Sequence, residues 1–283
     1  MFDLCKRWWQ YLNTRFMVLL ILPLTVIQYL VLVKVVGNGS SGINLIIGYG
    51  TFLAYFLLLR LLDEQKDFEH DSLYYPGRPV QIGLVSKREL NVLIFFICAV
   101  TLIVNSVLLP LAVSGWLWLT WLYIWLMRQE LFIKDWLRPR LVLYTLVHQV
   151  SVIILLTYII KLSSQSRWNL DTIAILLINW LIIFLIELGR KIRSTAEEPV
   201  GAGDTYSAYL GHAPATAFWL VIAFILIGYV IAIFQLVFWY WSLWLLAVGV
   251  GQKYVRADTP SSSKSIALTT VLICVMLEVG MLT

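Results

Sequence analysis

Residues 60–89 read RLLDEQKDFEHDSLYYPGRPVQIGLVSKRE, a charged and polar stretch that separates two long apolar runs. Within it, Asp63, Asp67 and Asp71 stand at positions i, i+4 and i+8. If the preceding apolar helix continues through them, each step of four residues turns about 400°, so the three carboxylates drift by only about 40° per step. The spacing therefore predicts one acidic stripe along a helix, and like charges at this spacing repel unless a cation or a basic partner neutralises them.

The composition of the whole chain accounts for the apolar runs on either side. Its 283 residues are 60% hydrophobic and 13% charged, and the mean hydropathy is +0.84. Soluble domains have about 45–50% apolar and about 25% charged residues. The apolar excess excludes a soluble enzyme, a secreted disulfide scaffold and a disordered regulator. It predicts a polytopic, all-α membrane helical bundle, with residues 1–283 forming a single transmembrane domain.

Apolar stretches long enough to cross a bilayer recur along the chain. A spanning helix needs about 20 mostly apolar residues. By that measure we expect nine transmembrane helices, near residues 16–36, 43–62, 90–111, 113–127, 140–161, 172–188, 214–235, 236–251 and 265–282. The fourth and eighth are short and follow tight turns, which we place at Pro110 and Gly115 for the first pair and within residues 234–241 for the second.

Basic residues concentrate on one predicted face of the membrane. The amino-terminal segment and the loops after spans two, four, six and eight hold 18 of the 21 Lys and Arg residues. Lys34, Lys161 and Arg167 fall on the other face. The positive-inside rule then places the amino terminus in the cytoplasm and, with nine spans, the carboxyl terminus outside. We expect a multi-pass protein of the inner or plasma membrane, if prokaryotic. Its net charge of +5 reflects topology and does not indicate a nucleic-acid partner.

Carboxylates form two clusters on the same predicted face, six of them within residues 63–89 and four within residues 187–204. Magnesium in proteins takes one or two carboxylates together with phosphate oxygens and water. Basic residues that could hold the phosphates are nearby: Arg78, Lys87, Arg88, Arg128, Arg190 and Lys191. This combination is what a magnesium–diphosphate site requires, although a solvated loop with self-pairing charges explains the same composition.

The order of residues in the first cluster resembles the first signature of the UbiA family of intramembrane prenyltransferases, N-x-x-x-D-x-x-x-D followed by R-P-x-x-x-G-x-(I/V)-S. Asp67 and Asp71 match its two aspartates, and Asp63 stands where the family has Asn. The matches to the second half are Arg78-Pro79, Gly83 and Ser86. The interval from Asp71 to Arg78 is about two residues shorter than usual. Nine helices with motif loops, here residues 63–89 and 187–213, are also that family's layout.

The second motif resembles the family less closely. Residues 187–211 read ELGRKIRSTAEEPVGAGDTYSAYLG, which begins with Glu187 but has Lys191 where the family has a second carboxylate. The candidates for the missing ligand are the carboxylates that follow: Glu197, Glu198 and Asp204. Alternatively, Arg190 and Lys191 replace part of the second ion's charge and hold the diphosphate directly. One magnesium ion is therefore expected, and a second is left open.

The resemblance implies a UbiA-type prenyltransferase that uses Mg²⁺ to assist diphosphate ionisation and works at a site facing the cytoplasm. Its partners would be an isoprenyl diphosphate donor, a small acceptor, aromatic or lipid-like, and the lipid bilayer. The implied metal ligands are Asp63, Asp67, Asp71, Glu187 and Glu198, of which the first four are also the implied catalytic residues. The implied diphosphate contacts are Arg78, Lys87, Arg128, Arg190 and Lys191.

Other functions explain parts of the same pattern. A UbiA-type membrane terpene cyclase shares the ionisation step but needs no acceptor, and a pseudoenzyme would bind the isoprenoid without turning it over. A divalent-ion transporter would use the acidic stripe to bind its ion. Transport predicts carboxylates at the membrane midplane and an inverted repeat, whereas the acids here lie at span ends. Glu130 and His148 are polar groups near or within the membrane whose roles the sequence leaves open.

Overall fold

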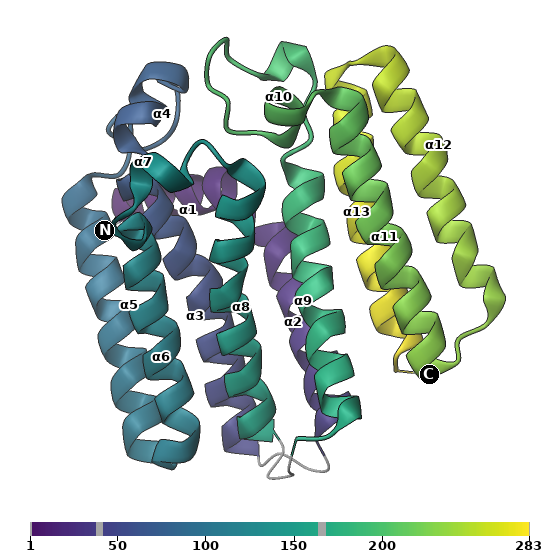
Figure 1. Cartoon of the computed structure of the whole chain (residues 1–283). Coiled ribbons are helices and arrows are strands. Elements are labelled where there is room, and N and C mark those ends of the chain that lie inside the picture. The colour runs from purple at the N-terminus through teal and green to yellow at the C-terminus, as the bar shows by residue number, and fades with distance from the viewer. Residues whose placement is uncertain (1, 38–41, 164–167, 283) are drawn as a thin grey trace. The chain divides into compact units, whose positions relative to one another are not determined.

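The computed structural model describes residues 2–37, 42–163 and 168–282, and every regular element in these ranges is helical (Figure 1). The chain divides into two compact units. Unit 1 comprises residues 1–33, 37–139 and 150–166, and unit 2 comprises residues 34–36, 140–149 and 167–283. Arg167, one of the three basic residues expected on the far face, lies outside the described residues.

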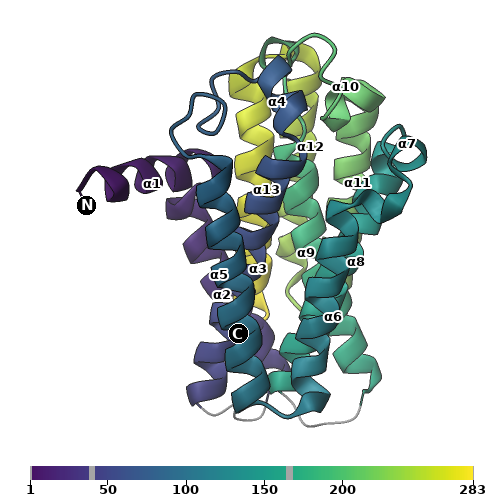
Figure 2. The same ribbon diagram turned by 90° about the vertical axis from the view of Figure 1, so that its left-hand side faces the viewer.

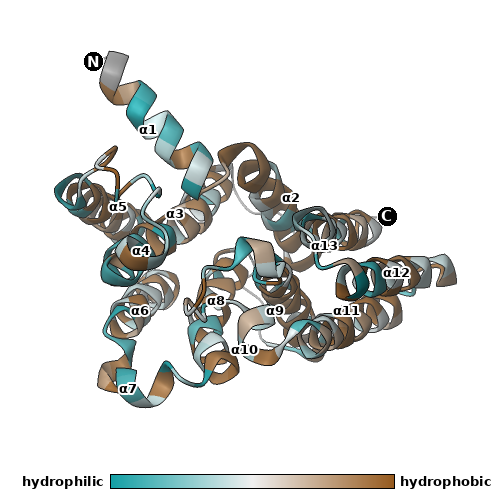
Figure 3. Cartoon of the chain, turned by 90° about the horizontal axis from the view of Figure 1, so that it is seen from above, coloured by the Kyte–Doolittle hydropathy of each residue, from teal (hydrophilic) through white to brown (hydrophobic). Residues whose placement is uncertain are grey.

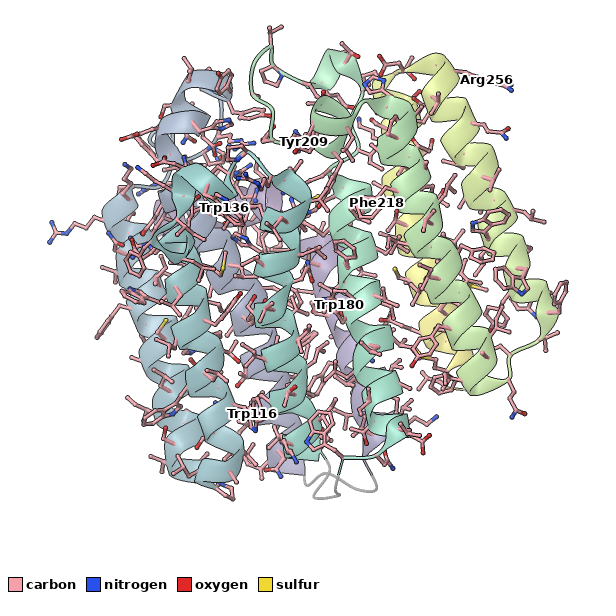
Figure 4. The ribbon with its side chains drawn as sticks, viewed as in Figure 1. Trp116, Trp136, Trp180, Tyr209, Phe218 and Arg256 are labelled. Carbon is pink, nitrogen blue, oxygen red and sulfur yellow. The ribbon has the colours of Figure 1, made fainter. Side chains whose placement is uncertain are left out.

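Unit 1 carries the first acidic cluster. Its elements are α1 (Phe2–Arg15), α2 (Val18–Val36), α3 (Gly42–Lys66), α4 (Phe68–Tyr74), α5 (Lys87–Leu108), α6 (Leu111–Arg128), η1 (Glu130–Phe132), α7 (Lys134–Leu137) and the later part of α8 (Leu141–Ser163). α3 packs against α5 and α6, and α5 and α6 run side by side (Figure 1). Trp116 near the start of α6 and Trp136 on α7 mark its two ends (Figure 4). Tryptophan is enriched at membrane interfaces.

Unit 2 carries the second acidic cluster. Its elements are α9 (Leu170–Arg190), η2 (Thr195–Glu197), α10 (Tyr206–Leu210), α11 (His212–Phe234), η3 (Phe238–Tyr240), α12 (Trp241–Ala257) and α13 (Pro260–Gly280). α9 packs against α11 and α13, and α12 packs against the same two helices. Gly189 permits the close contact of α9 with α13, because a Cβ at that position would lie 2.3 Å from Thr270 Oγ1. Arg256 at the end of α12 points away from α11 and α13 (Figure 4).

The membrane spans agree with the sequence in part. Seven of the described helices are long and apolar enough to cross a bilayer, namely α2, α3, α5, α8, α9, α11 and α13. The fourth and eighth expected spans form α6 and α12, helices of 18 and 17 residues that are not among the seven. α12 is short and α6 is rich in tryptophan, which favours the interface. The count of nine spans is therefore not confirmed, although the chain is a multi-pass membrane protein.

The turns within the two short pairs differ in how well they were predicted. Pro110 is the N-cap of α6, as expected, because its fixed φ suits a position just before a helix. Gly115 was expected in the same turn, but this was wrong, since it lies inside α6. The second turn is correct: α11 ends at Phe234 and α12 begins at Trp241.

The sequence did not predict the helix α1 that precedes the first span. It lies crosswise to α2 and α5 in Figure 2 and mixes hydrophilic with hydrophobic residues in Figure 3. Tyr11 of α1 is fully buried in a cluster with Leu61, Val80, Val85 and Leu90. α1 is thus held by apolar contacts to the end of α3, the start of α5 and the loop between them.

Candidate functional site

The three aspartates of the first cluster lie on consecutive helical turns. Asp63 is in the last turn of α3, Asp67 joins α3 to α4, and Asp71 is in α4. The backbone N–H of Asp67 donates to the carbonyl of Asp63 at 2.9 Å, and that of Asp71 donates to the carbonyl of Asp67 at 2.8 Å. These are α-helical i to i+4 bonds, so the spacing predicted from the sequence is present in the structure.

Asp71 is the most buried of the three and is surrounded by basic groups. Its side chain is 3% exposed, and its Oδ2 atom forms an ion pair with the Arg78 guanidinium. Nη2 of Arg15 lies 3.8 Å from the same oxygen, and Nδ1 of His70 lies 3.5 Å from Oδ1. A buried carboxylate is tolerated when it is paired in this way. The structure therefore neutralises Asp71 with the chain's own cations.

Asp63 is much more exposed than Asp71, and Asp67 is partly buried. The Asp63 side chain is 42% exposed and lies 3.4 Å from Nζ of Lys66. Burial raises the pKa of Asp67 to about 6, and the positive charge of Lys66 opposes this shift. The neighbouring charges of Asp63 and Asp71 raise the Asp67 pKa further. Like-charged carboxylates on one stripe disfavour full ionisation, and a bound cation would relieve that repulsion.

The loop that follows α4 positions Arg78 and starts α5. The Arg78 guanidinium lies over the ring of Tyr75, 3.8 Å from its centroid, which fixes the side chain that reaches Asp71. Gly83 has φ of +75°, a conformation that glycine adopts without strain. Ser86 is the N-cap of α5 and forms a capping box with Glu89. The glycine and serine of the motif therefore shape the loop and begin α5, whereas its arginine pairs with Asp71.

Two more predicted diphosphate contacts belong to unit 1. Nη2 of Arg128, at the end of α6, donates to Oε1 of Gln65 at 3.0 Å. Gln65 lies between Asp63 and Asp67 in sequence, so the structure brings Arg128 to the helix that carries the stripe. Nζ of Lys87 lies 3.3 Å from the centroid of the Phe68 ring, next to Asp67 along the chain.

The second cluster, in unit 2, has a different arrangement. Glu187 accepts a hydrogen bond from Nε of Arg190 at 2.5 Å, and Nζ of Lys191 lies 3.1 Å from its other carboxylate oxygen. A single carboxylate therefore faces two cations. This agrees with the alternative in which Arg190 and Lys191 replace part of a second ion's charge.

The carboxylates that follow Glu187 are engaged with hydroxyl groups. Glu198 accepts hydrogen bonds from the hydroxyls of Thr205 and Ser207, the latter at 2.6 Å. Glu197 accepts from Ser263 at 2.5 Å and closes a capping box with Ser194. Both therefore hold the loop between α9 and α10 in shape, and Asp204 also has a partner.

The two clusters differ in how well they fit a metal ion. Among the described residues, no three His, Cys, Asp or Glu side chains are gathered to hold a metal on their own. Magnesium, however, takes one or two carboxylates and completes its shell with phosphate oxygens and water. In the first cluster the two carboxylates that are less buried than Asp71, Asp63 and Asp67, suit that role. The second cluster does not fit, because two cations balance the charge of Glu187, and Oε1 of Glu198 already accepts hydrogen bonds from two hydroxyls.

Two residues left open by the sequence have clear partners. Glu130 is 3% exposed, and Nε of Arg138 donates to both of its oxygens at 2.7 and 2.9 Å. Nδ1 of His148 lies 2.9 Å from the carbonyl oxygen of Tyr144, and the two rings are 4.2 Å apart. Glu130 thus fixes the segment after α6, and His148 is held along α8.

Sequence reasoning missed two charged residues that complete the first cluster. Glu64 is fully buried, and Nε of Arg15 donates to its Oε1 at 2.5 Å. Nε of Arg60 lies 3.5 Å from the same oxygen. A glutamate within the last turn of an apolar helix was a signal, since a charge there needs a partner. The partner itself, 49 residues earlier in the chain, could not be read from the pattern.

These features define a class: an all-helical, multi-pass membrane bundle. Comparison with solved structures finds digeranylgeranylglyceryl phosphate synthase, a prenyltransferase of the UbiA superfamily, with a TM-score of 0.61. The match covers 98% of this chain and 99% of that chain at 10% sequence identity, so it shows the fold. No protein-family model and no curated protein sequence matches this chain. The resemblance recognised in the first motif is thus confirmed at the level of the fold.

Proposed function

We propose that this protein is an intramembrane prenyltransferase that moves an isoprenyl group from an isoprenyl diphosphate to a small aromatic or lipid-like acceptor. The observation that carries the proposal is the stripe of Asp63, Asp67 and Asp71 at the end of a membrane helix, with Arg78 and Arg128 bonded to the same helical segment. The UbiA-like fold supports it. Carboxylates and guanidinium groups side by side are suited to a metal-bound diphosphate.

In this proposal the residues of unit 1 bind and orient the diphosphate. Asp63 and Asp67 would hold one Mg²⁺, which when bound neutralises negative charge on the leaving diphosphate. Asp71 keeps Arg78 in place, and Arg78, Lys87 and Arg128 donate to phosphate oxygens. Preorganised cations of this kind act where charge develops in the transition state.

Unit 2 is considered by itself in the proposal. The expectation from the sequence that Arg190 and Lys191 contact a diphosphate stays a prediction, and within unit 2 Glu187 holds both side chains in place. A lysine or arginine beside a phosphate acts as a cation and needs no metal. We therefore propose one magnesium ion per chain.

The reaction would begin when the bond between C1 of the isoprenyl group and its diphosphate oxygen breaks, with the electron pair leaving on the diphosphate. A nucleophilic atom of the acceptor then forms a bond to C1, and the acceptor loses a proton to solvent or a base. Neutralising the leaving diphosphate lowers the barrier to the first step. A terpene cyclase would differ only in that a double bond of the same isoprenyl chain attacks C1.

The experiment is mass spectrometry of purified protein incubated with Mg²⁺ and geranyl, farnesyl or geranylgeranyl diphosphate, with and without a mixture of small aromatic and lipid acceptors. Asp67→Asn tests the stripe, and Glu69→Gln is the matched control, because Glu69 is exposed on the same short helix. Acceptor-dependent prenylated product, lost in Asp67→Asn alone, is the expected result. A cyclised product without acceptor would establish the cyclase instead. No diphosphate binding and no product would contradict both.

A further inference from the structure

The end of α1 places a basic side chain among the carboxylates of the first cluster. α1 ends at Arg15, and two residues later Met17 takes φ of +47° before α2 begins. The chain turns sharply at this point, because the left-handed conformation breaks the helix. The Arg15 side chain is directed to the end of α3, and it is 11% exposed.

Arg15 connects two buried carboxylates on successive helices. Its Nε atom donates to Oε1 of Glu64 on α3 at 2.5 Å, and its Nη2 atom lies 3.8 Å from Oδ2 of Asp71 on α4. Glu64 is fully buried and Asp71 is 3% exposed. A planar guanidinium with several donors can serve two carboxylates at once. The orientation of Asp71 therefore depends on Arg15 as well as on Arg78.

A second arginine of α1, Arg7, holds α1 in place without contacting the aspartate stripe among the described residues. It therefore allows the docking of α1 to be tested apart from the positioning of Asp71. Arg7 donates to Oε1 of Glu89 at 3.0 Å and to the carbonyl of Leu84 at 2.9 Å. These contacts hold α1 to the start of α5 and to the loop before it. Arg7 has no contact with the aspartate stripe among the interactions described, so it shares with Arg15 only the docking of α1.

We propose that Arg15 is a positioning residue, which together with Glu64 fixes Asp71 beside Arg78 and so arranges the stripe before the cation and the diphosphate bind. The role of Asp71 in that binding rests on the proposed function. The placement of Asp71 by Arg15 does not, and it can be measured without substrate. α1, which the sequence shows only as a basic segment before the first span, thus becomes part of the site.

The first arm of the test needs no substrate. Arg15→Met alone would leave Glu64 as a buried unpaired charge, so Glu64→Gln is present in every variant. On that background, Arg15→Met, Asp71→Asn and their combination are compared by thermal unfolding in detergent. The expected result is a non-additive change, in which Arg15→Met lowers the unfolding midpoint less when Asp71 is already Asn. Equal effects of Arg15→Met on both backgrounds would overturn the proposal.

The second arm measures Mg²⁺-dependent binding of farnesyl thiolodiphosphate, a donor analogue that ionises poorly. The combined Arg15→Met and Glu64→Gln changes leave the net charge unaltered, and they are expected to raise the Mg²⁺ concentration for half-maximal binding by about tenfold. Arg7→Met should leave this Mg²⁺ concentration unchanged. Arg15→Lys in place of Arg15→Met, with Glu64→Gln kept, should bring it part of the way back to the wild-type value. A wild-type Mg²⁺ requirement in the combined variant would overturn the proposal. If the wild-type protein binds no analogue, the proposed function fails, and the first arm alone decides whether Arg15 positions Asp71.

Discussion

Both acidic clusters combine carboxylates with nearby basic residues, but they differ in how many basic groups contact each carboxylate. In the first, Asp63, Asp67 and Asp71 follow one another on consecutive helical turns, and only Asp71 is fully enclosed by arginines. In the second, the single Glu187 faces both Arg190 and Lys191. In the first cluster carboxylates therefore outnumber the basic groups that contact them, whereas in the second one carboxylate contacts two basic groups.

This difference distinguishes metal binding from direct contact with phosphate, two roles that the family resemblance alone would assign to both clusters. Paired acidic motifs suggest a metal ion at each, but the contacts within each unit do not support that symmetry. Replacing a carboxylate by lysine changes a metal ligand into a direct phosphate contact. These local contacts favour one metal ion at the first cluster and direct cationic contacts at the second.

The largest expected effect is that of removing a stripe carboxylate. Asp67→Asn keeps the size of the side chain but removes its charge, and we expect product formation to fall by about 100-fold or more. Excess Mg²⁺ should recover part of this loss. Steady-state rates across a Mg²⁺ titration check it, with Glu69→Gln as the control. A variant with wild-type rates at ordinary Mg²⁺ would remove the stripe from the mechanism.

The next effect concerns Arg78, which pairs with Asp71 and which we propose also contacts the diphosphate. Arg78→Lys keeps the charge but loses the planar stacking on Tyr75 and the forked contact with Asp71. We expect the KM for the donor to rise about tenfold with a smaller change in kcat. Arg256→Lys is the control, since Arg256 is exposed at the end of α12 and has no part in the proposed site. A donor KM for Arg78→Lys equal to that of the control would mean that positive charge alone is what position 78 supplies.

A smaller effect is expected at the second cluster. Glu187→Gln removes the ion-pair partner of Arg190 and Lys191, but in our proposal it removes no metal ligand. Partly exposed ion pairs contribute at most about 1 kcal/mol, which is roughly fivefold in affinity. The KM for the donor should change by about that factor, while the Mg²⁺ requirement stays at the wild-type value. A Glu187→Gln variant that needs as much extra Mg²⁺ as Asp67→Asn would break the contrast between the clusters.

The smallest effect is on the stability of the second-cluster loop. Burial opposes ionisation of Asp258, but hydrogen bonds from Thr195 and the nearby His212 lower its pKa below the usual 3.8 overall. The charged form is favoured in the folded state, so its contribution to stability is present above pH 3.8 and is lost as the pH falls through the lowered value. Asp258→Asn should lower the unfolding midpoint by about 2–4 °C at pH 7.

The pH dependence of that difference is the check on its cause. Asparagine tolerates the left-handed conformation at this position, where φ is +41°, so the backbone should not be strained by the change. Thermal unfolding of both proteins from pH 7 to pH 3 should show the gap closing below pH 3.8. A gap that stays constant down to pH 3 would mean that the carboxylate charge is not what Thr195 stabilises.

The local features of the site could be predicted from the sequence because they depend on helical spacing. Asp63, Asp67 and Asp71 are four residues apart, and a continuing apolar helix leaves little choice about where they lie. The ends of the apolar runs likewise predicted the helices, including the break between Phe234 and Trp241. The fold class followed from composition and motif together.

The long-range contacts could not be predicted in the same way. The pairing of Arg15 with Glu64 joins residues 49 positions apart, and it requires the bend at Met17, for which the sequence has no glycine or proline. The hydrogen bonds that Glu198 accepts from Thr205 and Ser207 could not be predicted either, because both hydroxyls lie beyond a loop rich in glycine. Periodicity reports which face a residue occupies, but it does not report which distant side chain meets it there.

The most direct test of the account is the number of divalent cations bound per chain. Mn²⁺ as a substitute for Mg²⁺ can be counted by electron paramagnetic resonance in the presence of farnesyl thiolodiphosphate. The account predicts one Mn²⁺ per chain, lost in Asp67→Asn and kept in Glu187→Gln. Two ions per chain, or one that is lost in Glu187→Gln and kept in Asp67→Asn, would contradict it.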